Sequence, residues 1–451
     1  MRRRDARGNP VSTASAAALA ASERALWRMM SFYGTPLADL DAAIEADPAW
    51  PLPRLMKAGF LLSLTEPSLV GAAAASLDEA AALGAVRDER ERDHHAALRS
   101  LAAGDSITAG ERWGSLLRRQ PRDALALQWL HLLDFYRGDA TQLLGHVEAV
   151  LPTWPDDDPL QPYVLALHAF GLEESGRYGE AEAAGRRALA GAARVPWAIH
   201  AVAHVMEMQG RHEEGARWMG DWRRDWGALK GDGSDGDPNG FAGHLGWHEA
   251  LFALESLDTD TALRVFDDYL DASRIEITLQ RVDAAALLWR LRLLGADVGD
   301  RWQKLIAAWP LDAAAAGRSV FNDAHATMAL IGAGKSARAR DWVALCIAEA
   351  ERRSGWNHDV SREIGAPLLR GLLAFGEGRY GEGAEAIAPL RDRLARIGGS
   401  HAQRDVIEQT LLAAAANGAD RGAGRALLAA RLRAKPATPL GAHWRARVGG
   451  E

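Results

Sequence analysis

The chain has 451 residues, of which 48% are hydrophobic and 25% are charged, as expected for a globular protein with a sizeable core. The formal net charge of −7 and the absence of a basic stripe argue against a nucleic-acid partner. Alanine is abundant and alternating β-type runs are scarce, so the composition predicts an all-α fold.

The N-terminal residues 1–20 are predicted to form a disordered or frayed tail. The segment Val11–Ala21 is rich in alanine, serine and threonine rather than leucine, and it continues without a break into an amphipathic helix, which argues against a secretory signal peptide. No window of the sequence has the length and apolarity of a membrane span. We therefore expect a cytoplasmic protein that does not bind a membrane.

Residues 21–451 contain a phrase that recurs at a regular spacing. Gly-Arg-Tyr-Gly-Glu-Ala-Glu begins at Gly176, Gly-Arg-His-Glu-Glu-Gly-Ala begins 34 residues later at Gly210, and a third copy begins at Gly378. This spacing is the period of tetratricopeptide repeats (TPRs), in which one helix ends at a glycine and a second helix returns. The repeat predicts a single right-handed, TPR-like α-solenoid of stacked helical hairpins over these residues.

One segment, residues 230–243, breaks the period because it is rich in glycine and aspartate and cannot form a helix. The spacing of Asp232, Asp235 and Asp237 does not match an EF-hand calcium loop, and no glutamate follows at the twelfth position. We expect a long surface loop that covers the mouth of a pocket.

Two predicted helices on either side of this loop each carry a pair of histidines four residues apart. At about 100° per residue, such a pair lies on one face of a helix. In a solenoid, equivalent helices of successive repeats stand side by side, so we expect the two pairs to converge. The first helix carries His200, His204 and Glu207, and the second carries His244, Trp247, His248 and Glu255.

The paired histidines have three interpretations. Imidazoles at this spacing can share a divalent metal ion such as zinc, although the His-Glu-x-x-His motif of zincin proteases is not present. They can also act as general acid and base groups of an enzyme, or serve only as hydrogen-bonding groups in a helical core. Trp247 is either a wall of the pocket or part of the core. The candidate metal ligands are His200, His204, His244 and His248, and the candidate catalytic residues are His200, His204, Glu207 and His248.

Two later segments add polar residues to predicted helices. In the first, Asn322 or Asp323 is a natural N-cap, which places His325 in the first turn of an apolar helix. In the second, Ser400 and Gln403 fit an N-terminal capping box.

The stripe that follows this capping box is either a solvated salt-bridge ladder or a clamp for the carboxylate of a ligand. Its residues are His401, Arg404, Asp405 and Glu408. The single cysteine, Cys346, lies in an apolar run and is expected to be a buried, inert thiol.

Four phrases resemble, in their order and spacing, the tetratricopeptide repeat protein 38 family. They are His-Ala-Val-Ala-His-Val-Met-Glu-Met from His200, Trp-His-Glu-Ala-Leu-Phe-Ala-Leu-Glu from Trp247, Phe-Asn-Asp-Ala-His from Phe321, and Gly-Gly-Ser-His-Ala-Gln-Arg-Asp-Val from Gly398. The resemblance spans nearly the whole chain, and the last phrase is the most specific. The resemblance implies a TPR-like solenoid and a bacterial, soluble relative of animal proteins. It assigns no catalytic role to any residue of this sequence.

Two functions follow from these observations. The first is a binding module whose concave, histidine-rich pocket captures a small molecule or a peptide. The second is an enzyme, either a metal-dependent hydrolase or an acid/base catalyst. The unexpected polar residues lie in helices that read as buried, which favours a small ligand over a peptide. No motif requires a cofactor, and a homo-oligomer is compatible with the sequence.

Overall fold

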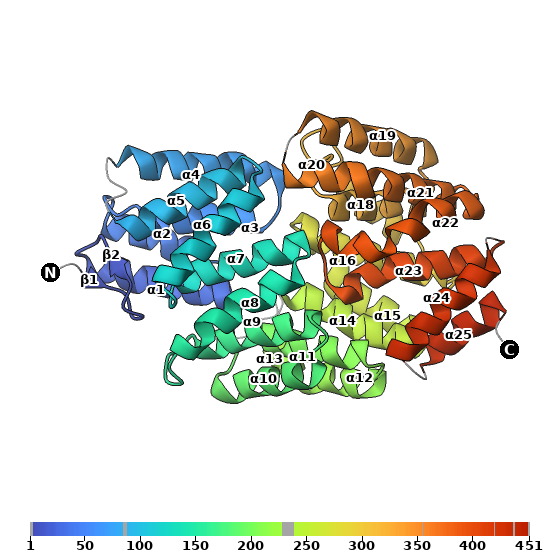
Figure 1. Cartoon of the computed structure of the whole chain (residues 1–451), viewed down its shortest axis with the longest axis horizontal. Helices are drawn as coiled ribbons and strands as arrows, with labels where there is room; N and C mark the ends of the chain where they lie inside the picture. The colour runs from blue at the N-terminus through green and yellow to red at the C-terminus, as the bar shows by residue number, and fades with distance from the viewer. Residues whose placement is uncertain are drawn as a thin grey trace. The chain divides into compact units, whose positions relative to one another are not determined.

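The computed structural model describes residues 3–83, 88–227, 239–353, 355–418, 420–435 and 438–449. These residues form helices joined by short turns, with one pair of two-residue strands, which confirms the predicted all-α class. The chain divides into two compact units. The first holds the residues up to Val202 and Arg224–Phe241, and the second holds Ala203–Arg223 and the residues from Ala242 onward. The boundary falls within the continuous helix α11 (Pro196–Met208) (Figure 1).

The first unit is a run of helical hairpins around its own apolar core. Its helices are α1 (Ala16–Ser31), α2 (Leu37–Ala46), α3 (Leu52–Ser63), α4 (Val70–Ala82), α5 (Glu89–Ala102), α6 (Ser106–Arg119), α7 (Ala124–Arg137), α8 (Ala140–Val150), α9 (Gln161–Glu174), α10 (Tyr178–Gly191) and most of α13 (Arg223–Trp226). From α1 to α10, each odd-numbered helix packs against the even-numbered helix that follows it. This is the pairing that the repeated phrases predict.

The N-terminal segment is ordered from Arg3 onward, although the sequence predicted a disordered or frayed tail. The strands β1 (Arg3–Arg4) and β2 (Pro10–Val11) pair antiparallel. Asp5 is 8% exposed and lies 3.9 Å from Arg7 and 3.6 Å from Arg90 of α5. Buried ion pairs to a segment distant in the sequence therefore hold residues whose local composition suggests a tail.

The second unit has a separate apolar core. Besides the C-terminal half of α11, its helices are α12 (His212–Asp221), α14 (Ala242–Glu255), α15 (Thr259–Val265), α16 (Thr278–Leu293), α17 (Arg301–Ala307), α18 (Val320–Gly332), α19 (Ser336–Arg352), α20 (Trp356–Val360), α21 (Ala366–Gly376), α22 (Tyr380–Ile387), α23 (His401–Ala416), α24 (Arg421–Ala434) and α25 (Pro439–Val448). Where the sequence predicted one solenoid, each unit is thus built around a core of its own.

The repeated phrases fall at the turns of the hairpins. Gly176 follows α9 with φ 75°, and Gly210 follows α11 with φ 71°. In each turn the next amide donates back into the helix, Arg177 to the carbonyl of Leu172 at 2.9 Å and Arg211 to that of Met206 at 2.8 Å. Because a side chain is strained at this φ, the phrase begins with glycine. The equivalent glycines Gly138, Gly334 and Gly378 also have positive φ.

Helix α16 is central to the second unit, because it packs against α14, α17, α18 and α23. Every residue from Val282 to Leu291 is buried. A helix that is enclosed on all sides is normally apolar all round, yet this one carries Asp283 and Arg290. These two charged residues lie beside the candidate site.

Part of the predicted loop, residues 228–238, lies outside the described residues, so its role as a pocket cover stays a prediction. In the remaining part, Asn239 forms an isolated β-bridge with Tyr33. Helix α14 already begins at Ala242, inside the predicted loop.

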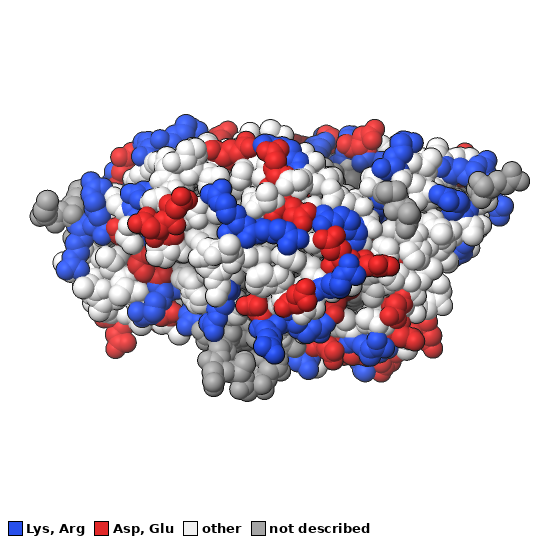
Figure 2. Space-filling view, turned by 90° about the horizontal axis from the view of Figure 1, so that it is seen from below, with Lys and Arg blue, Asp and Glu red and all other residues white. Residues whose placement is uncertain are grey.

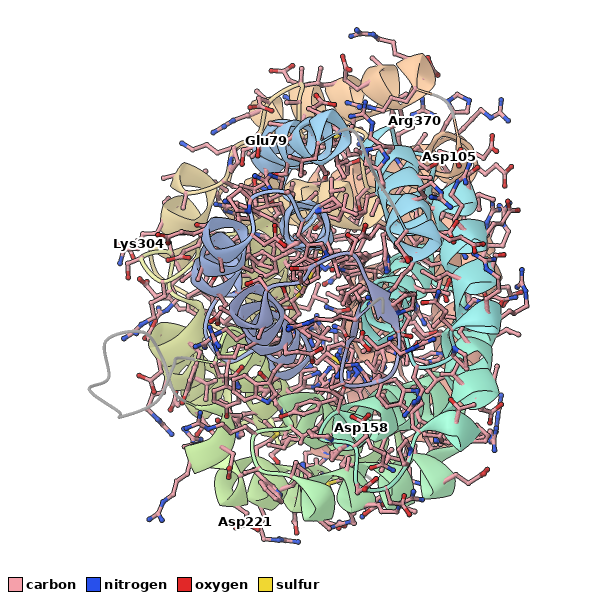
Figure 3. The ribbon with its side chains drawn as sticks, turned by 90° about the vertical axis from the view of Figure 1, so that its left-hand side faces the viewer. Glu79, Asp105, Asp158, Asp221, Lys304 and Arg370 are labelled. Atoms are coloured by element: carbon pink, nitrogen blue, oxygen red, sulfur yellow. The ribbon has the colours of Figure 1, made fainter. Side chains whose placement is uncertain are left out.

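Charged residues of both signs lie close together on the face shown in Figure 2. Lys304, at the edge of the view in Figure 3, forms a surface ion pair with Asp300 at 3.1 Å. Among the described residues, no helix combines the length and the apolar composition needed to cross a membrane.

Candidate histidine site

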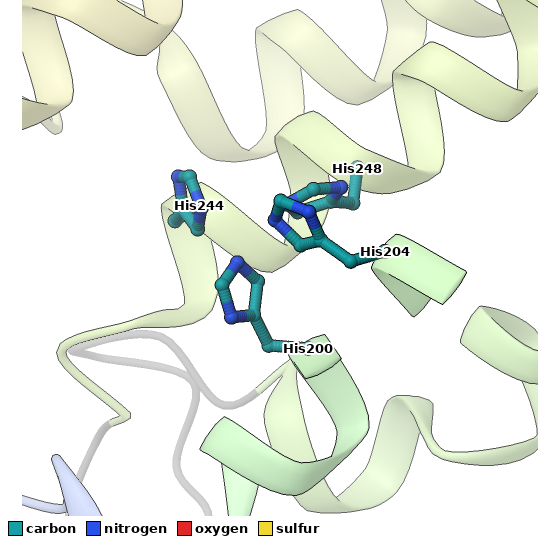
Figure 4. Close-up of side chains that lie close together, drawn as sticks. All are labelled: His200, His204, His244 and His248. Carbon is teal, nitrogen blue, oxygen red and sulfur yellow. The ribbon is translucent and has the colours of Figure 1, made fainter. Parts of the chain in front are cut away.

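Three of the predicted histidines come together in the second unit. His204 lies on the C-terminal half of α11, and His244 and His248 lie one turn apart on α14 (Figure 4). Each offers one ring nitrogen, and these nitrogens lie within 4.8 Å of one another. The ring centroid of His248 is 4.5 Å from that of His204 and 4.9 Å from that of His244. We call these three residues the histidine cluster.

His200 lies one turn before His204 on the same continuous helix and on the same helix face (Figure 4). It is 2% exposed and packs among aromatic side chains of the first unit. Its ring is stacked on Phe170 at 5.2 Å and lies 4.9 Å from Trp197 and 5.1 Å from Phe241. These rings embed the N-terminal half of α11 in the first unit.

Asp283 of α16 orients His244. Its Oδ2 lies 2.8 Å from Nδ1 of His244. A carboxylate can only accept a hydrogen bond, so Nδ1 carries the hydrogen, and in the neutral ring this leaves the lone pair on Nε2. Gln403 of α23 donates to the other Asp283 oxygen at 3.4 Å. The Gln403 side chain also closes the predicted capping box with Ser400, which the structure confirms.

Glu207 lies beside His248, but no hydrogen bond joins the two side chains. Its Oε2 lies 3.4 Å from Nδ1 of His248, and both residues are buried. Burial, reinforced by the positive charges of nearby side chains, holds the pKa of His248 well below its ordinary value. The imidazole is therefore neutral at neutral pH, the form that binds metal ions.

Lys435, at the end of α24, joins the two carboxylates of this region. Its Nζ donates to Glu207 at 3.3 Å and to Glu255 at 3.2 Å. Burial alone would lower the pKa of Lys435, but Glu255 and Glu207 outweigh it and raise this pKa above its ordinary value. One turn earlier, Arg431 pairs with Asp405 of α23 and lies 3.6 Å from Glu255. The buried acids beside α24 are thus matched by cations.

Trp247 and Arg290 complete the surroundings of the cluster. Trp247 is fully buried, and its ring centroid lies 4.9 Å from that of His248 and 5.4 Å from that of His244. The guanidinium carbon of Arg290 lies 5.4 Å from the centroid of the same indole. Trp247 therefore belongs to the core and also borders the cluster.

Helix α18 begins earlier than the sequence predicted. Its N-cap is Ser319, whose hydroxyl accepts from the amide of Asn322, so neither Asn322 nor Asp323 is the cap. The extended backbone of Ser319 starts the helix three residues sooner, which places Asp323 and His325 on buried positions. Burial raises the pKa of Asp323 to about 7 and lowers the pKa of His325 to about 4.

The two acids of the predicted stripe on α23 pair with arginines outside the stripe, and its role as a clamp for a ligand stays a prediction. His401 and Arg404 lie on the first turn of the helix, and Arg404 donates to the carbonyl of Gly399. The acids pair with arginines of other segments, Asp405 with Arg431 and Glu408 with Arg391 at 3.2 Å. Both carboxylates thus pair with side chains from distant parts of the sequence and not with Arg404 on the same helix.

Sequence reasoning missed four charged residues around the cluster, all of them buried: Asp283, Arg290, Arg431 and Lys435. One signal was present, because the first two flank an apolar run in a helix that otherwise reads as core. Cys346, by contrast, is buried as predicted, and burial raises the pKa of its thiol.

Comparison with known proteins concerns the fold. No family model matches the chain. The chain is similar to a tetratricopeptide repeat protein from Parabacteroides merdae ATCC 43184, with 14% identity, 72% of this chain and 98% of that chain covered, and a TM-score of 0.32. It is also similar to yeast Tom70, with 11% identity, 93% and 84% covered, and a TM-score of 0.38.

Proposed function

We propose that this TPR-like protein binds a divalent transition-metal ion, with zinc as the reference ion, at the histidine cluster. The observation that carries the proposal is the convergence of three imidazole nitrogens within 4.8 Å, with a carboxylate hydrogen-bonded behind one of the rings, His244. Metal-bound histidines characteristically donate their second ring N–H to a carboxylate. A cluster that served only for packing would not need this arrangement.

The chemistry of the donors fits a zinc-like ion. Imidazole is a common ligand of zinc, copper and nickel, with zinc–nitrogen distances of about 2.0–2.1 Å. Asp283 leaves Nε2 of His244 with a lone pair, and the lowered pKa of His248 keeps that ring neutral. His204 supplies the third imidazole, and His200 lies one turn earlier on the same helix.

The burial of the cluster favours a small ligand over a peptide. His204 and His248 are 0% exposed, whereas TPR-type peptide recognition uses an extended concave surface. An ion or a small molecule reaches such a position through local opening of the structure, but a peptide chain does not. The proposal also includes membership of the tetratricopeptide repeat protein 38 family, which rests on the four phrases quoted above.

The test is the metal content of protein purified without a histidine tag, followed by zinc titration of metal-free protein. We expect one ion per chain, and we expect His248→Ala or His244→Ala to abolish stoichiometric binding. His443→Ala, which changes a partly exposed histidine on α25, is the matched control and should bind as the unmodified protein does. Cobalt substitution adds a spectroscopic readout of nitrogen ligation. Metal-free protein that takes up no ion would refute the proposal.

A metal-dependent enzyme is the second candidate, favoured by Glu207 beside His248. An ion held by three imidazoles keeps an open position for water and lowers the pKa of that water. Glu207 would then be the nearest carboxylate for proton transfer. Hydrolysis of a panel of chromogenic esters by the zinc-loaded protein, lost in His248→Ala, tests this role.

A further inference from the structure

Arg290 is a buried cation whose guanidinium contacts no carboxylate of the described residues. It is 1% exposed, and its guanidinium donates to two neutral carbonyl oxygens, of Ala402 at 2.7 Å and of Ala286 at 3.2 Å. No carboxylate of the described residues lies within 4.0 Å of its nitrogens. A buried guanidinium normally has an anionic partner, because removing the charge from water is costly.

The other buried cations near the cluster do have such partners. Lys435 lies between Glu207 and Glu255, and Arg431 pairs with Asp405. Arg290 thus differs from its neighbours because no carboxylate contacts it directly, although Asp405, Glu207 and Glu255 attract its charge at longer range.

Two further polar atoms beside Arg290 lack a hydrogen-bond partner. Nε1 of Trp247, the indole over which the guanidinium lies, is buried and makes no hydrogen bond. Nε2 of His325 is likewise buried without a partner, while Nδ1 of the same ring lies 2.7 Å from the carbonyl of Phe321. His325 lies on α18, which packs directly against α16. Buried polar atoms are rarely left unsatisfied, so these two atoms indicate a polar partner that the protein itself does not supply.

We propose that Arg290 binds the carboxylate of a small organic acid that is taken up beside the histidine cluster. The planar guanidinium suits a carboxylate, to which it can donate two parallel hydrogen bonds. The indole N–H of Trp247 adds a further donor. The position of the acid next to a metal ion rests on the proposed function, whereas its contact with Arg290 does not.

The experiment compares acetate with acetamide, a neutral molecule of the same shape, by ligand-observed NMR titration of the zinc-loaded and the metal-free protein. We expect acetate to bind at least about tenfold more tightly than acetamide. Arg290→Met should remove this preference, and Arg290→Lys should keep only part of it because it loses the planar fork. Arg292→Met, on an exposed position of the same helix, is the matched control and should leave the preference unchanged.

The outcomes separate this inference from the proposed function. Equal binding of acetate and acetamide, or an undiminished preference in Arg290→Met, would overturn the inference. Tighter binding of inorganic phosphate than of acetate would also overturn it, since the site would then prefer a dianion. If zinc does not bind but acetate binding still depends on Arg290, the metal site is wrong and the anion site stands. If Arg290→Met does not fold, Arg290→Lys decides the question.

Discussion

The Nδ1 atom of His244 lies 2.8 Å from the Oδ2 atom of Asp283, so a carboxylate on the buried helix α16 fixes the orientation of an imidazole on α14. Asp283 is itself 4% exposed and held by Gln403 of α23. Three helices therefore determine where the remaining nitrogen of His244 lies. If the cluster binds a metal ion, this arrangement must contribute to its affinity.

Replacing Asp283 by asparagine should weaken zinc binding by about 10–100-fold, the usual effect of removing a carboxylate behind a metal-bound histidine. The amide keeps the size of the side chain, but it lowers the basicity of the ring and no longer enforces one tautomer. Competition with a chromogenic chelator measures the change. Asp300→Asn, at an exposed position, is the control, and equal zinc affinity in both variants would show that Asp283 is only structural.

Lys435→Met should destabilise the protein by about 3–5 kcal/mol, because it leaves the carboxylates of Glu207 and Glu255 buried without their cation. Urea denaturation of metal-free protein measures this loss. Lys304→Met should change the stability by less than about 0.5 kcal/mol, since Lys304 is 54% exposed in its ion pair. A loss below about 1 kcal/mol for Lys435→Met would mean that water reaches the two acids.

The hairpins and the histidine spacing could be predicted because both depend on local signals. A glycine at the turn, such as Gly210, is required by the backbone conformation there. Histidines at positions i and i+4, such as His244 and His248, share a helix face wherever the helix lies. Neither conclusion needs knowledge of distant contacts.

The partners of these histidines could not be predicted, because they come from distant parts of the chain. Asp283 is 39 residues from His244, and Lys435 is 228 residues from Glu207. Nothing in a single sequence indicates which of its many charged residues pair with one another across such distances. The same limit explains the ordered N-terminal segment, where Asp5 is held by Arg90.

His325 predicts a loss of stability in acid. Its folded-state pKa is about 4, below the ordinary value of 6.5, so between these values the unfolded chain binds a proton that the folded protein does not. Its contribution is therefore lost as the pH falls through this window. Between pH 7 and pH 5, the unmodified protein should lose about 2 kcal/mol more than His325→Asn. Urea denaturation at both pH values tests this difference, and equal losses would contradict it.

Replacing glycine by alanine should change the stability in opposite directions at a turn and inside a helix. Gly176→Ala should destabilise the protein by about 1–2 kcal/mol, because φ 75° is strained for alanine although no atom lies within 4 Å of the added carbon. Gly145→Ala, inside α8 and equally open, should stabilise it by about 0.5–1 kcal/mol. Thermal or urea denaturation measures both. Two changes of the same sign would argue against the hairpin turn.

Asp323 predicts a pH dependence opposite to that of His325. Burial raises its folded-state pKa from 3.8 to about 7, so between these values the folded protein holds a proton that the unfolded chain has released. Stability is therefore lost as the pH rises through this window.

Asparagine at position 323 cannot ionise and keeps the oxygen that accepts from the amide of Gly317. Between pH 5 and pH 7, the unmodified protein should therefore lose about 2 kcal/mol relative to Asp323→Asn. Denaturation at both pH values measures this, with Asp300→Asn as the control that should follow the unmodified protein. Parallel stability curves for the unmodified protein and Asp323→Asn would show that the carboxyl is already ionised in the fold. The positive charge of Arg353, which favours the ionised carboxylate, would then outweigh the effect of burial.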